Sequence, residues 1–206
     1  MKTRQYLHTR GVDALALFCI AMLFGAHAMA AERHYKIDTK GMHAFISFKI
    51  KHLGFSWLEG HIRRFDGDFV FDKDNPANNR VQVMMDMRSL DSNHAERDKH
   101  LKSADFFDVK TYPQATFVST GWEDQGNGRA SLKGVLTLRG IEKPVELAVT
   151  HLGGGKDPWG GYRQGFEATG ELRLSDFNMK KAAMLGPEAE QIKIWISLEG
   201  IWQPNK

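Results

Sequence analysis

The feature that most constrains this chain is a strict alternation of apolar and polar residues that recurs along its length. Ile46, Phe48 and Ile50 share one parity, and Ser47 and Lys49 lie between them. This period of two is typical of a half-buried strand, because successive side chains of a strand point to opposite faces of the sheet. The pattern therefore predicts an all-β protein.

The same alternation returns in further segments, which are separated by residues that favour turns. The first two long predicted strands are 44–51 and a strand that follows the break at Leu53-Gly54 and leads through 65–71. The others cover 35–38, 81–87, 115–119, 130–138, 145–149, 166–174 and 192–202. The predicted turns lie at 74–76, 125–128, 139–140, 153–155 and 185–187. About eight or nine strands, each with one apolar face, indicate an up-and-down antiparallel sheet. Sheets of this size close into a barrel or pack as a sandwich.

One polar segment, residues 93–103, departs from the alternation and is rich in helix-forming residues. Asn93 can cap a helix there, with Glu96 reaching back as in a capping box. We therefore expect a short helix, followed by the apolar pair Phe106 and Phe107.

The first 30 of the 206 residues have the pattern of a secretory signal peptide. Lys2 and Arg4 give a basic start, residues 14–24 are apolar, and 28–30 read Ala-Met-Ala. The apolar run is too short to serve as a membrane anchor. We expect cleavage after Ala30, export, and a single domain that covers residues 31–206.

Composition excludes several classes of function for the exported chain. Cleavage would remove the only cysteine, Cys19, and with it any disulfide or thiolate metal site. Three of the 28 Lys and Arg and one of the 25 Asp and Glu would also be removed, which leaves 25 and 24, a net charge of +1. No basic stripe with interleaved aromatics is present, so we expect no nucleic-acid partner. The chain has no GxSxG or HExxH motif.

The predicted inward-facing positions carry no Lys, Arg, Asp or Glu, so they offer no titratable group for catalysis. We therefore expect no enzyme, no cofactor and no metal. Several of these positions are small: Ala44, Gly67, Ala115, Gly134, Ala168, Gly170 and Gly200. Small residues either relieve strand curvature or leave room inside the barrel. The second possibility predicts a hollow barrel that binds an apolar molecule.

Four further residues can be interpreted in two ways. His52 and His61 flank a turn and could approach each other as metal ligands, but histidines at turns are more often surface residues. Trp57 and Trp159 lie in segments that fit the rim of a barrel. They would either contact a ligand or seal the barrel ends.

The order of several motifs along the whole exported chain resembles the YceI family. These motifs are HLGFSWLEG (52–60), FDGDF (65–69), NHAERDKHLKSADFF (93–107), YPQATF (112–117), GVLTLRG (134–140), DPWGGYRQGFEA (157–168) and DFNM (176–179). The resemblance implies an extended, eight-stranded, lipocalin-like antiparallel barrel with a short covering helix. It also implies a periplasmic protein that binds a long polyisoprenoid or another amphiphile, such as an isoprenoid quinone or a fatty-acid derivative. Many members have glycine where this chain has Asn178.

We therefore expect non-enzymatic binding, storage or transport of an apolar lipid in the barrel. The predicted ligand-binding residues are Phe48, Phe65, Phe69, Phe117, Leu136, Phe166, Leu172 and Ile196 on the wall and Leu101, Phe106 and Phe107 in the covering segment. The chain would not span a membrane. Val135, Trp195 and Ile201 on the outer face would suit a homodimer.

Two alternatives belong to other classes. The first is an enzyme or redox-linked factor that acts on lipids or quinones through Glu96, Asp98, His94 or His100 at the mouth of the pocket. The second is an envelope-stress protein that works through a protein partner.

Overall fold

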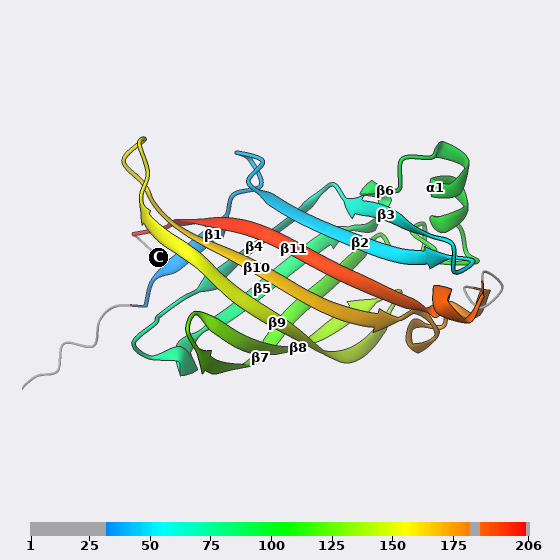
Figure 1. Ribbon diagram of the computed structural model, residues 1–206. Coiled ribbons are helices and arrows are strands. Elements are labelled where there is room, and N and C mark those ends of the chain that lie inside the picture. Colours follow the sequence, from blue (N-terminus) through cyan, green and yellow to red (C-terminus); the bar gives the residue numbers. More distant parts are fainter. Residues whose placement is uncertain (1–31, 182–185, 205–206) are drawn as a thin grey trace, which may run out of the picture. The chain divides into compact units, whose positions relative to one another are not determined.

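Eleven strand segments pair into one antiparallel sheet that closes on itself (Figure 1). The computed structural model describes residues 32–181 and 186–204, so the predicted signal peptide and its cleavage site lie outside the described residues. The strands are β1 (His34–Ile37), β2 (Ala44–His52), β3 (Ser56–Ile62), β4 (Phe65–Val70), β5 (Arg80–Asp86), β6 (Leu90–Asp91), β7 (Gln114–Gly126), β8 (Arg129–Leu138), β9 (Ile141–Lys156), β10 (Tyr162–Arg173) and β11 (Gln191–Trp202).

Closure makes an eight-stranded barrel, because three pairs of short segments each act as one long strand. β1 and β2 both pair with β11, one after the other along its length. β3 and β4 continue each other in the same way, as do β5 and β6. The remaining five strands follow in sequence order as an up-and-down meander. The predicted all-β barrel is confirmed.

The alternation places the predicted apolar faces inside the barrel. Ile192, Ile194 and Ile196 of β11 lie opposite Ile50, Phe48 and Ile46 of β2. Five of the six line the interior cavity, and Ile50 packs against the core. Further pairs of this kind around the ring form a continuous apolar core. Opposite charges face outward, as in the ion pair between Lys49 and Glu59. Burial of only one face fixes the register of each strand, because a shift by one residue would move its apolar side chains to the outer face.

Two of the predicted turns are tight hairpins with left-handed backbone. Asn127 and Gly128 join β7 to β8, and Arg139 and Gly140 join β8 to β9, all at positive φ. The turn predicted at 153–155 is wrong. Those glycines continue β9 and pair with β10, and the chain reverses only at 157–161.

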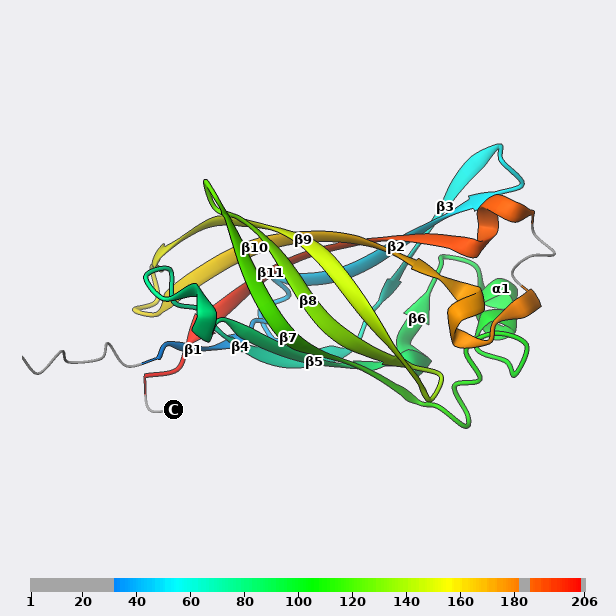
Figure 2. The same cartoon turned by 90° about the horizontal axis from the view of Figure 1, so that it is seen from below.

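The single α-helix of the described residues, α1 (Ala95–Leu101), lies at one end of the barrel (Figures 1 and 2). The predicted cap is wrong by one residue. Asn93 adopts a left-handed conformation, and the Nδ1 atom of His94 accepts the N–H of Arg97 at 3.2 Å. Glu96 therefore does not complete a capping box with Asn93.

Short 3₁₀ turns occupy several connections, namely η1 (Pro76–Asn78), η2 (Met87–Ser89), η3 (Leu174–Phe177) and η5 (Pro187–Glu190). None of the helices in the described ranges is both long enough and apolar enough to cross a membrane.

Candidate functional site

An apolar cavity of about 190 Å³ runs through the inside of the barrel. Its wall is built by inward-facing residues from all eleven strands, together with residues of the connections. Its lining is Ile37, Ile46, Phe48, Ile62, Phe65, Phe69, Val70, Phe71, Arg80, Val81, Val83, Met85, Met87, Leu90, Phe107, Ala115, Phe117, Trp122, Leu132, Leu136, Leu138, Val145, Leu147, Val149, Phe166, Ala168, Leu172, Leu174, Phe177, Ile192, Ile194, Ile196 and Leu198. Almost all of these side chains are aliphatic or aromatic, so the cavity is suited to an apolar ligand.

The structure places all but two of the predicted ligand-binding residues on this wall. The wall residues among them are Phe48, Phe65, Phe69, Phe107, Phe117, Leu136, Phe166, Leu172 and Ile196. Leu101 packs against the core from α1 without lining the cavity, and Phe106 is buried in the core beside His100. The contact of these side chains with a ligand stays a prediction.

The inward-facing glycines do not leave open space, which corrects the interpretation that they hollow the barrel. A Cβ atom at Gly134 would overlap the ring of Phe117, and one at Gly200 would overlap the ring of Phe69. Gly134 and Gly200 therefore provide room for aromatic rings, whereas Gly170 provides room for the side chain of Leu147. The cavity is the space that remains between these packed rings.

The wall also contains one charged residue, although none was predicted at the inward-facing positions. Arg80 lies at the start of β5 and reaches the cavity with part of its side chain. Its guanidinium group donates to the carboxylate of Glu32 at 2.6 Å and to the carbonyl oxygen of Asn78 at 3.1 Å. The charge is thus held at the barrel end and leaves the middle of the cavity apolar.

A polar pair that the sequence analysis missed lies inside the barrel at the end far from α1. The Nε2 atom of His151 and the Oε1 atom of Gln164 are 2.6 Å apart. The imidazole packs 4.9 Å from the ring of Phe71 and 5.0 Å from that of Phe166, and both rings line the cavity. The alternation would have included both polar residues if it had been extended by one step on β9 and on β10.

The hydroxyl of Tyr35 adds a further polar group to this region. Tyr35 is 1% exposed and stacks on Phe69 at 5.0 Å, and its Oη atom has no hydrogen-bond partner among the described residues. A buried, unpaired hydroxyl costs about 1–3 kcal/mol unless water or a ligand satisfies it. This end of the barrel is therefore aromatic but not purely apolar.

The opposite end is closed by the segment between β6 and β7, which includes α1. Phe107 turns its ring into the cavity wall from this segment. Arg139, at the β8–β9 turn, donates to the carbonyl oxygens of Ala104 and Asn178, each at 2.9 Å. The arginine thus ties the covering segment to the turn that follows η3.

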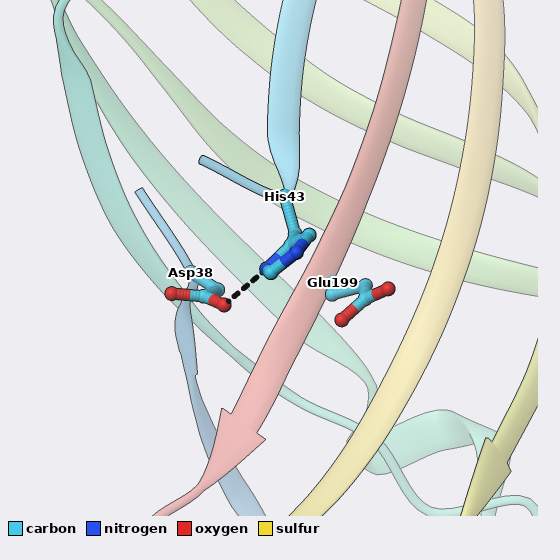
Figure 3. Close-up of side chains that lie close together, drawn as sticks. All are labelled: Asp38, His43 and Glu199. Atoms are coloured by element: carbon cyan, nitrogen blue, oxygen red, sulfur yellow. Dashed lines mark hydrogen bonds and ion pairs between the residues drawn. The ribbon is translucent and has the colours of Figure 1, made fainter. Parts of the chain in front are cut away.

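An ion-pair network lies where β1 breaks from β2. Asp38, His43 and Glu199 bring potential metal ligands within 4.8 Å of one another (Figure 3). The guanidinium group of Arg163 donates to Asp38 at 2.6 Å, to Glu199 at 3.0 Å and to Asp157 at 2.9 Å. The pKa of Arg163 is raised, chiefly by its hydrogen bond to Asp38. Because a cation already occupies these carboxylates, the cluster is an internal salt bridge.

The other candidates from the sequence lie away from the cavity wall. His61 bonds the hydroxyl of Ser47 at 3.0 Å, and the metal-ligand cluster of the described residues includes neither His61 nor His52. Trp57 and Trp159 are both exposed, so they neither line the cavity nor seal its ends.

The charged residues of the helical segment also stay off the wall. Asp98 accepts from Ser92, and His94 caps α1. Glu96 and His100 are likewise absent from the lining.

These features define a closed, antiparallel, eight-stranded barrel with an apolar interior and one short helix at its end. The chain belongs to the YceI-like family, whose model matches residues 35–200. The UPF0312 protein of Photorhabdus laumondii is 51% identical over 187 residues, which cover 91% of this chain and 95% of that protein. Protein YceI of Escherichia coli O157:H7 is 50% identical over 190 residues, covering 92% and 97%.

Solved structures share the same fold. The crystal structure of Burkholderia cenocepacia BcnA has a TM-score of 0.71 and 26% identity, and it covers 79% of this chain and 98% of that one. A polyisoprenoid binding domain from Saccharophagus degradans, described as implicated in plant cell wall breakdown, has a TM-score of 0.58 and 13% identity. It covers 82% of this chain and 98% of that one. At this identity the second likeness concerns the fold alone.

Proposed function

We propose that this protein binds a lipid with a long apolar chain, of the polyisoprenoid or isoprenoid-quinone type, and stores or transports it without chemistry of its own. The observation that carries the proposal is the continuous apolar cavity that runs through the barrel. Membership of the YceI-like family, and the polyisoprenoid binding described for a protein of the same fold, support the ligand class.

Burial of apolar surface is sufficient to drive such binding. Removal of apolar surface from water stabilises a complex by roughly 25 cal/mol per Å². A chain that buries on the order of 300 Å² of apolar surface would gain roughly 7 kcal/mol, which must exceed the cost of ordering the chain. Aliphatic and aromatic walls provide no directional contact, so they select for a slender apolar shape rather than for one compound.

The size of the cavity sets a condition on binding. A volume of about 190 Å³ is below the ~300–1,000 Å³ of typical ligand pockets. A long chain must therefore displace wall side chains as it enters. Met85 and Met87 line the cavity and can move most readily, because a methionine side chain is unbranched and flexible.

The polar end gives the proposed ligand a direction. His151, Gln164 and the hydroxyl of Tyr35 gather at the end far from α1, within an aromatic surround. A carbonyl or hydroxyl head group could exchange hydrogen bonds there, while its chain extends between the apolar strands. We therefore propose an amphiphile with its head at the His151 end.

The proposed setting is the periplasm, after removal of residues 1–30. The basic, apolar and small-residue regions of the N-terminus support export. The lack of any cysteine in the remaining chain is compatible with an oxidising compartment.

Native mass spectrometry of the protein, purified from periplasm without detergent, tests these points together. We expect the intact mass of residues 31–206 and a stoichiometric adduct that organic solvent extracts as an isoprenoid or acyl lipid. A protein free of adduct that also takes up no added polyisoprenoid or quinone would contradict the proposed function. A mass that still includes residues 1–30 would contradict export by cleavage.

A further inference from the structure

The β2–β3 hairpin projects from the α1 end of the barrel (Figures 1 and 2), and it carries three exposed apolar side chains. Leu53 is 51% exposed, Phe55 is 87% exposed and Trp57 is 42% exposed. β11 pairs with β2 only as far as Ile50, whose partner is Ile192. Beyond that point the two strands of the hairpin pair only with each other in the described residues.

The turn at the tip of the hairpin places a leucine in a backbone conformation that leucine disfavours. Leu53 and Gly54 have φ values of 52° and 78°, the left-handed conformation that disfavours a branched side chain. The β7–β8 hairpin has nearly the same conformation with Asn127 and Gly128, the residues that such a turn prefers. A leucine in place of asparagine costs stability and adds exposed apolar surface.

Two lysine side chains lie against the ring of Trp57 in the same hairpin. The Nζ atoms of Lys51 and Lys193 lie 4.9 Å and 5.3 Å from the centroid of the Trp57 ring. Lys193 lies 3.8 Å from the carboxylate of Glu171, whereas Lys51 makes no ion pair with any described residue. Glu59, the nearest acid on β3, is paired with Lys49.

We propose that the β2–β3 hairpin docks this protein on a lipid bilayer with anionic head groups. Leu53 and Phe55 would enter the boundary between head groups and acyl chains, the depth reached by the apolar side of interfacial segments. Trp57 would lie at the level of the head groups, where tryptophan is enriched. Lys51 and Lys193 would face the lipid phosphates. The charge beside the apolar tip selects an anionic membrane as the partner.

This surface complements the proposed cargo but does not depend on it. A lipid carrier must meet a membrane to load or unload, and the hairpin lies at the same end as the covering segment (Figure 1). Vesicle binding can be measured whether or not the cavity holds a ligand, so the two proposals can fail separately.

The test is flotation of the full-length mature protein with vesicles of phosphatidylcholine, alone or with phosphatidylglycerol. The wild-type protein should float with the anionic vesicles, and less so as salt is raised, since the lysine contribution is screened. The Leu53→Asn and Phe55→Ser double variant should partition at least about tenfold more weakly. Leu152→Asn is the matched control, because Leu152 is 62% exposed on β9 and lies outside the hairpin. It should bind like the wild type.

Leu53→Asn by itself separates docking from a structural role. Asparagine suits the left-handed turn, so this variant should melt about 2–4 °C higher than the wild type while binding vesicles more weakly. Failure of the wild type to bind anionic vesicles would overturn the proposal, as would wild-type binding by the double variant. The result is independent of whether native mass spectrometry finds a lipid in the cavity.

Discussion

At the scale of single residues, Gly134 shows how the barrel accommodates its aromatic core. A Cβ atom there would overlap the ring of Phe117 and approach the carbonyl oxygen of Val118 at 2.7 Å. Gly134→Ala should therefore force the ring or the strand to move. We expect a loss of roughly 1–3 kcal/mol in the free energy of unfolding, measured by urea denaturation.

Gly121, on β7, provides the matched control for this substitution. No heavy atom lies within 4 Å of a Cβ added at Gly121. Gly121→Ala should leave stability unchanged or raise it by up to about 1 kcal/mol, because alanine restricts the unfolded chain. Equal effects of the two substitutions would show that Gly134 does not make room for the ring of Phe117.

At the scale of elements, ion pairs of Asp38 stabilise the connection between β1 and β2. Burial by itself would raise the pKa of Asp38, but hydrogen bonds from Arg163, His43 and the Gly41 N–H outweigh it. They lower the pKa to about 2 from the ordinary 3.8. A carboxylate with a lowered pKa stabilises the fold fully above its unfolded pKa. This contribution is lost as pH falls from about 4 towards 2.

The pH dependence of unfolding tests whether the lowered pKa of Asp38 stabilises the fold. The free energy of unfolding of the wild type should fall more steeply between about pH 4.5 and pH 2.5 than that of Asp38→Asn, in urea titrations at each pH. The variant should also be less stable at pH 7, since Arg163 loses a charged partner. Parallel pH profiles would show that Asp38 is not ionised differently in the folded state.

The elements also show what the sequence could predict. Strands were predictable because one-sided burial leaves a period of two in any single stretch, as at Ile46 and Phe48. The gap between β1 and β2 was predicted as well, but the breaks at 63–64 and 87–89 were not, because they depend on which distant strands pair. The missed polar pair has a local cause. Because residues 153–155 were predicted to form a turn, one predicted strand ended at 149 and the next began at 166. The predicted interior therefore did not include His151 and Gln164.

At the scale of the whole molecule, the two ends of the barrel differ. Polar groups gather beside His151, whereas the hairpin with Leu53 and Phe55 projects at the α1 end. A barrel docked by its hairpin would hold the polar end away from the membrane. The head of an amphiphile would then lie at the far end, and its chain would extend back towards the bilayer. The proposed docking surface and the proposed site of the head group thus lie at opposite ends of the barrel.

Obstruction of the cavity at mid-length tests whether the interior is where the lipid binds. Ala168 lies on the cavity wall in β10, opposite Val149 on one side and Ile196 on the other. Ala168→Phe places a ring where the wall has only a methyl group, so it should reduce lipid occupancy at least about tenfold in native mass spectrometry. A thermal melt must show that the variant folds, because an added ring in a packed wall costs about 1–3 kcal/mol.

Thr169→Phe is the control for this obstruction, since Thr169 is the next residue of the strand and is exposed on the outer face. It adds the same ring outside the barrel and should leave lipid occupancy unchanged. If Ala168→Phe folds and still carries a full complement of lipid, the ligand does not thread the cavity. The lipid would then have to bind on the outer surface, where the hairpin combines exposed apolar side chains with the nearby ammonium group of Lys51. Loss of occupancy in the Leu53→Asn and Phe55→Ser double variant would identify that surface site.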